Sequence, residues 1–193
     1  MRYVMALLAL SLPFSTSLAP QAAAQDVTPS QLRHMTAAQF QAGIEKEGAQ
    51  AFMARITKDI DPHSAEEPNY DIILNHIATG QEAWLKIASE IGPYTMPPYS
   101  AEPNFSRGLD VAIAYALIEN PAAVLRMRNA DEHFMNACMY PFPQPSTTFL
   151  QHFQHRAFIA LTRVKDPELK VRKEDCHKEL QTFPTENASN GNY

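Results

Sequence analysis

Proline limits what this chain can fold into more than any other residue type. The 193 residues include 15 prolines and only six glycines. A proline inside a helix or a central strand removes a backbone hydrogen bond, so it tends to stand at the ends of these elements. Between the prolines, apolar residues recur at spacings of three and four, and the alternation typical of strands is scarce. The sequence predicts an all-α fold, a compact array of about six to eight short helices stacked as helical hairpins.

The first helices can be placed from their end signals. Thr36 and Gln39 have the spacing of a capping box, which predicts a helix from about Ala37 to about Lys58 that breaks or bends at Gly48. Two short helices then end at glycines that are separated by eleven residues, which is typical of an antiparallel hairpin. These glycines are Gly80 and Gly92, and Trp84 lies on the apolar face between them. Trp84 is therefore expected in the core.

The second half of the chain is predicted to begin with a loop. Four of the residues from 92 to 106 are proline, so this segment is expected to be neither helix nor strand. Helix starts are expected at Arg107, at Asn120–Pro121, at Ser146 or Thr147, and at Asp166–Pro167.

The N-terminal segment has the pattern of a secretory signal peptide. Met1 and Arg2 precede the apolar run 3–10, and three alanines at 22–24 suit a signal peptidase. The sequence thus predicts a signal peptide at 1–24, a single helical domain at 25–182 and a disordered polar tail at 183–193. The expected location is secreted and periplasmic.

Two cysteines, Cys138 and Cys176, are the only ones in the chain. In an exported protein, a lone pair is more typical of a disulfide than of free thiols or metal ligands. The predicted bridge fastens the last helix to the loop before the preceding helix.

Three stretches resemble a loose group of small exported proteobacterial helical proteins of unestablished activity. The residues that carry the resemblance are the Gly-x-x-x-Trp-Leu motif at 80–85, the stretch 108–112, and the Ala-Leu-x-x-Asn-Pro-x-x-Val-Leu motif at 116–125. The resemblance covers about residues 70–180 and includes both cysteines. It implies the helical fold and the exported location, and it supplies no catalytic residue.

Charge and missing motifs exclude several function classes. The formal net charge is -5, which disfavours nucleic acids and anionic membrane surfaces, and we expect no membrane insertion after signal cleavage. Nucleophile-elbow, P-loop and dinucleotide-binding motifs are absent, so no cofactor is predicted. His152 and His155 are a runner-up metal pair without a full ligand set, and the polar residues of segment 59–67 are better explained as a solvated acidic linker than as a calcium loop. No metal site is predicted.

Aromatic residues on proline-rich segments are the candidate partner-binding residues. They are Tyr94, Met96, Tyr99 and Phe105 in the first loop, and Tyr140 and Phe142 in the second. Stiff backbone lowers the entropy lost on contact, which suits a protein-binding surface, and the alternative is that these rings complete the core. The favoured function is a non-catalytic exported protein that binds another exported or envelope protein, of the inhibitor or immunity type. A small metal-dependent or hydrolytic periplasmic enzyme and a structural or stress-related envelope protein are the alternatives.

Overall fold

Helices are the only regular secondary structure in the described part of the chain. The structure is a computed structural model that describes residues 29–56, 69–95, 103–127 and 137–186. These residues form nine α-helices, two short 3-10 helices and no strand, which confirms the all-α prediction. The α-helices are α1 (Pro29–His34), α2 (Ala37–Glu47), α3 (Ala49–Ile56), α4 (Asn69–Ala78), α5 (Glu82–Ile91), α6 (Pro103–Glu119), α7 (Pro121–Arg126), α9 (Thr147–Thr162) and α10 (Lys170–Glu186).

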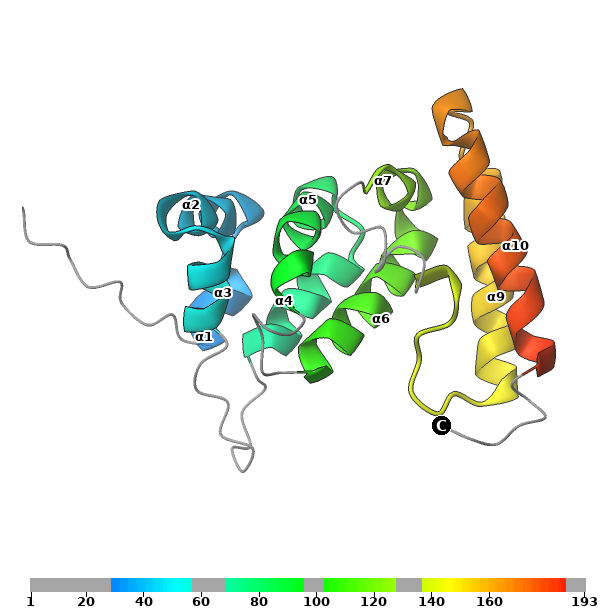
Figure 1. The fold of residues 1–193 in the computed structure, drawn as a ribbon, viewed down its shortest axis with the longest axis horizontal. Helices are drawn as coiled ribbons and strands as arrows, with labels where there is room; N and C mark the ends of the chain where they lie inside the picture. Colours follow the sequence, from blue (N-terminus) through cyan, green and yellow to red (C-terminus); the bar gives the residue numbers. More distant parts are fainter. Residues whose placement is uncertain (1–28, 57–68, 96–102, 128–136, 187–193) are drawn as a thin grey trace, which may run out of the picture.

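The helices stack along the long axis of the molecule (Figure 1). At one end α2 and α3 pack against each other and against α5, while α4 packs against α5 and α6. Helices α6 and α7 then contact α9, and α9 pairs with α10 at the other end. One apolar cluster extends from Leu32 to Leu180 through these helices. The predicted stack of helical hairpins is confirmed.

Helices α2 and α3 form the first hairpin, as their end signals predict. The Thr36 hydroxyl accepts a hydrogen bond from the Gln39 backbone, and the chain breaks at Gly48, where φ is +82°. Across the hairpin the Arg55 guanidinium donates to both carboxylate oxygens of Glu47, at 2.8 and 2.9 Å. This hydrogen-bonded ion pair holds the pKa of Glu47 below its usual range. The pair therefore fastens α3 to α2 outside their apolar contact.

Trp84 lies in the core, as its place on the helical face predicts. Its side chain is only 3% exposed. It stacks on the ring of His76 in α4, with ring centroids 4.4 Å apart, and meets the edge of Phe40 in α2 at 5.4 Å. A single residue of α5 thus joins three helices.

The Gly80 turn is bonded to the start of α7. Gly80 has φ +71°, a conformation that favours glycine, and its carbonyl accepts a 2.9 Å hydrogen bond from the Asn120 amide. The carbonyl oxygen of the same Asn120 side chain accepts from the backbone of Ala123 and caps α7, which Pro121 begins. Two segments 40 residues apart in the sequence are therefore fixed by one side chain.

We expect Asn120→Ala to lower the free energy of unfolding by about 1–3 kcal/mol, because it removes a helix cap and a tertiary hydrogen bond together. Urea denaturation followed by circular dichroism measures the loss. Ser146→Ala is the matched control, since the Ser146 hydroxyl caps α9 in the same way without the second bond. Equal losses in the two variants would contradict a role for the Asn120–Gly80 bond.

Two predicted boundaries are wrong. Helix α6 begins at Pro103, four residues before the predicted start at Arg107, because a proline fits the first turn of a helix, where its missing N–H is not needed. Helix α10 continues to Glu186 and so passes the predicted start of the polar tail at residue 183. The predicted signal peptide, the acidic segment 59–67 and residues 187–193 lie outside the described residues.

A disulfide and two arginines attach the C-terminal hairpin, formed by α9 and α10, to the segment before α9 and to the ends of α6 and α7. Cys138 and Cys176 form the predicted disulfide, and both are fully buried. Arg163 donates to the carbonyl of Ile118 at the end of α6. Arg172 of α10 donates to the carbonyls of Leu125 and Met127 at the end of α7. These three carbonyls lie at helix ends, where partners within the helix are missing, and the arginines pair them.

Candidate protein-binding surface

Four aromatic rings meet where α6, α9 and the segment before α9 come together. Phe142 lies at the centre, and its ring makes edge-to-face contacts with Tyr115 at 5.6 Å, with Phe149 at 4.8 Å and with Phe153 at 4.8 Å. Phe153 is buried beneath, whereas Tyr115 is 39% and Phe149 is 37% exposed. Phe142 itself is half-buried. We call Tyr115, Phe142 and Phe149 the neutral aromatic surface.

The backbone that carries Phe142 is held from both sides. Pro141 and Pro143 flank it, and the Ser146 hydroxyl closes the segment by capping α9. On the other side, Tyr140 is buried and its hydroxyl donates to the backbone carbonyl of Leu180 in α10. Burial raises the pKa of Tyr140 to about 12, so this hydroxyl keeps its proton at physiological pH. Phe142 is thus presented on a preorganised backbone.

This region of the chain carries no formal charge. The sequence from His133 to His155 contains no Asp, Glu, Lys or Arg, although 19% of the chain is charged. Apart from Phe149, the exposed side chains from Pro143 to His155 are hydroxyls, amides, a proline and imidazoles, among them Gln144, Thr148 and His152. The centres of protein interfaces are depleted in charged residues and enriched in aromatic rings and Met. The composition of this surface fits that description.

The structure separates the six predicted partner-binding residues into three groups. Phe142 belongs to the neutral aromatic surface, and Tyr94 is half-buried in the 3-10 helix η1 (Gly92–Tyr94). Phe105 and Tyr140 are 2% and 3% exposed, so both rings complete the core, which was the alternative reading of these loops. Neither ring is accessible to a partner in this structure. Met96 and Tyr99 lie outside the described residues.

Sequence reasoning missed Tyr115, Met139 and Phe149, which are all partly exposed. Phe149 stands in the first turn of α9, at the edge of the core. The exposure of Tyr115 could have been predicted from the sequence, because this residue lies outside the apolar stripe of α6. That stripe contains the buried residues Leu109, Ile113 and Leu117. A large aromatic residue on the polar side of an amphipathic helix indicates a surface position.

Among the described residues, no further metal ligand joins His152 and His155, the alternative metal pair. His152 and His155 are both exposed on α9. Within the described ranges, no three His, Cys, Asp or Glu side chains lie close enough to hold a metal ion. Both cysteines are occupied by their disulfide.

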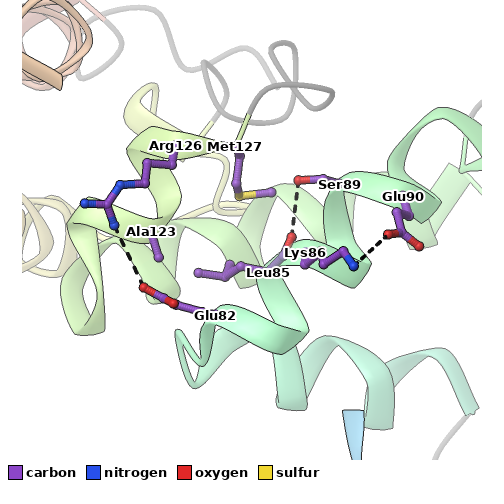
Figure 2. Close-up of a pocket in the computed structure, with 8 residues that line it drawn as sticks. All are labelled: Glu82, Leu85, Lys86, Ser89, Glu90, Ala123, Arg126 and Met127. Carbon is purple, nitrogen blue, oxygen red and sulfur yellow. Dashed lines mark hydrogen bonds and ion pairs between the residues drawn. The ribbon is translucent and has the colours of Figure 1, made fainter. Parts of the chain in front are cut away.

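A groove of about 410 Å³ lies between α5 and α7, and Figure 2 shows the residues that line it. Its charged rim residues form ion pairs, Arg126 with Glu82 at 3.9 Å and Lys86 with Glu90 at 3.8 Å. Arg126 also pairs with Asp166 at 3.0 Å. The apolar part of the lining is Leu85, Ala123 and Met127. The charged groups of this groove already pair with acidic or basic neighbours, so they are less available to orient a ligand. The neutral aromatic surface is therefore the stronger candidate for a binding site.

Fold and surface together define a class: a disulfide-bonded helical array that carries an exposed aromatic surface. Comparisons with protein-family models, with curated proteins and with solved structures found no match for this chain. Of the helices that the structure describes, none is long and apolar enough to span a bilayer.

Proposed function

We propose that this protein is a non-catalytic, exported helical domain that binds another protein of the cell envelope through the neutral aromatic surface. The partner is an exported or envelope protein, and the binding is of the inhibitor or immunity type. The observation that carries the proposal is the exposed ring cluster around Phe142, which stands on a backbone fixed by prolines and by the buried Tyr140.

Two features support this function over the alternatives. Aromatic anchors on rigid backbone lose little conformational entropy on binding, and such anchors supply much of the affinity of protein interfaces. The disulfide between Cys138 and Cys176 supports an oxidising compartment, in keeping with the predicted signal peptide and a periplasmic location. No observation favours a hydrolytic or metal-dependent enzyme, or a purely structural envelope protein, to the same degree.

Affinity capture with the full chain as bait tests the proposal. Extracts of the cells that make the protein are passed over the wild type and over the double variant Tyr115→Ser and Phe149→Ser. We expect the wild type to retain a partner whose recovery falls at least about tenfold with the variant, because both exposed anchors are lost.

The matched control replaces two exposed apolar residues that do not contact Phe142. Ile159 and Val171 are 51% and 67% exposed on α9 and α10, so Ile159→Ser with Val171→Ser changes overall hydrophobicity to a similar extent. Capture that is equal for all three proteins would refute binding through the neutral aromatic surface. Thermal melts of the three baits verify that each is folded.

A further inference from the structure

One backbone carbonyl of α10 lacks its ordinary helical donor. Pro184 stands four residues after Leu180 within α10 and has no backbone N–H, so it cannot donate to the Leu180 carbonyl. Leu180 is fully buried, so water does not take the place of this donor. Because a buried carbonyl without a donor is unfavourable, neighbouring groups are expected to pair with it.

Two side chains from outside α10 donate to the Leu180 carbonyl. They are the hydroxyl of Tyr140, in the segment before α9, and the side-chain amide of Gln154 in α9. A carbonyl oxygen has two lone pairs, so these two donors fill its capacity. In a regular helix one lone pair would already accept from the N–H four residues later. Pro184 thus leaves room for the Tyr140 hydroxyl on α10.

The segment that carries Phe142 has a backbone conformation that needs such an attachment. Tyr140 and Gln144, which lie on either side of Phe142, have φ angles of +59° and +46°. Positive φ is unfavourable for residues other than glycine, so the segment would leave this conformation if nothing opposed the change.

The hydrogen bond of Tyr140 is the second of two attachments of this segment to α10. The disulfide joins Cys138 to Cys176, and Leu180, the acceptor for Tyr140, lies one turn further along the helix. From Tyr140 the chain reaches Phe142 in two residues. The way in which Tyr140 is held against α10 therefore determines where the Phe142 ring lies.

We propose that Pro184 and Tyr140 are the positioning residues of the neutral aromatic surface. Pro184 keeps the Leu180 carbonyl available, and the Tyr140 hydroxyl uses this carbonyl to hold the segment of Phe142 in place. Neither residue belongs to the surface, so both act through Phe142. Their importance for partner binding rests on the proposed function, whereas the arrangement of the rings is a property of the protein alone.

Nuclear magnetic resonance of the full chain with isotope-labelled Phe and Tyr rings tests this inference without a partner. Nuclear Overhauser contacts of Phe142 with Tyr115 and Phe149 report whether the rings are in place, since the ring centroids are 5.6 and 4.8 Å apart. We expect these contacts to weaken at least about threefold in Tyr140→Phe, which removes one hydrogen bond and keeps the buried ring.

Thr95→Val is the matched control for Tyr140→Phe. The buried Thr95 hydroxyl also donates to a backbone carbonyl, that of Gly92, at 2.8 Å. Its loss should leave the ring contacts of Phe142 unchanged. Ring contacts that keep their full strength in Tyr140→Phe overturn the inference, and so does equal weakening in the control.

Pro184→Ala separates positioning from stability. The alanine N–H can donate to the Leu180 carbonyl and so compete with the Tyr140 hydroxyl, while alanine also favours the helix. We expect the ring contacts of Phe142 to weaken although the urea midpoint does not fall. In the Tyr140→Phe background the same substitution pairs a carbonyl that has lost a donor, so it should raise the midpoint by more than in the wild type. Equal midpoint changes in the two backgrounds, or unchanged ring contacts in Pro184→Ala, overturn the inference.

The inference and the proposed function fail in different measurements. Where the wild type captures a partner, Tyr140→Phe should recover at least about threefold less of it, although Tyr115, Phe142 and Phe149 are all present. Weakened ring contacts with undiminished capture overturn the role of the positioning residues in binding. Weakened contacts in a protein whose wild type captures no partner support the positioning and remove the proposed function. Full ring contacts in Tyr140→Phe overturn the inference and leave the proposed function intact.

Discussion

Replacing both cysteines with alanine is expected to lower the free energy of unfolding by about 4 kcal/mol, because the bridge closes a loop of 38 residues and restricts the unfolded chain. For a chain of this length, such a loss corresponds to a fall in melting temperature of roughly 10 °C. Thermal unfolding of the oxidised wild type and of the double variant Cys138→Ala and Cys176→Ala, followed by circular dichroism, measures it.

The reducing agent serves as a second probe of the same bond. Dithiothreitol should lower the melting temperature of the wild type toward that of the double variant and leave the double variant unchanged. If the untreated protein contains two titratable thiols and melts at the same temperature with and without reductant, the Cys138–Cys176 bridge does not contribute as argued.

Trp84→Ala should have a comparable effect, with a loss of about 3–5 kcal/mol, because it opens a large cavity among three helices. The side chain is buried between His76 and Phe40, so both ring contacts are lost with it. Since Trp84 is the only tryptophan, tryptophan fluorescence would be lost with the substitution, and urea unfolding is best followed by far-ultraviolet circular dichroism.

Two variants of the same helix set the scale for this measurement. Trp84→Phe keeps a ring beside His76 and should lose distinctly less than Trp84→Ala. Lys86→Ala alters an exposed residue of α5 and should change the free energy of unfolding by less than about 0.5 kcal/mol. Similar values for Trp84→Ala and Lys86→Ala would contradict the core role of the indole.

Local signals in the sequence were enough to predict most of the fold. Capping side chains and glycine stops act within a few residues, so the starts at Ala37 and Pro121 and the turn at Gly80 could be placed correctly. The start of α6 at Pro103 was not predicted, because proline disfavours the interior of a helix but is common in its first turn. The compartment predicted from the N-terminal pattern made the Cys138–Cys176 pairing the natural choice, and the structure contains it.

The candidate site was less predictable, because exposure depends on which helices pack together. Phe142, predicted from its proline-rich segment, is half-buried, but Tyr140, two residues earlier, turns inward through a backbone φ of +59°. That conformation is uncommon for a non-glycine residue, and periodicity does not reveal it. Tyr115 and Phe149 join Phe142 only through the packing of α6 against α9, which brings together residues that are far apart in the sequence.

The arginines of the C-terminal hairpin determine how the molecule loses its structure. Arg163 donates to a carbonyl at the end of α6, and Arg172 donates to two carbonyls at the end of α7. Each of these hydrogen bonds therefore exists only while the helix end that it contacts is intact. Unravelling the end of α6 breaks the bond from Arg163, and unravelling the end of α7 breaks the bonds from Arg172, so either event weakens the attachment of the hairpin. Stacked helical hairpins can come apart one after another from an end. Here the last hairpin and the helices beside it are coupled, so this half of the stack is expected to unfold as one cooperative unit.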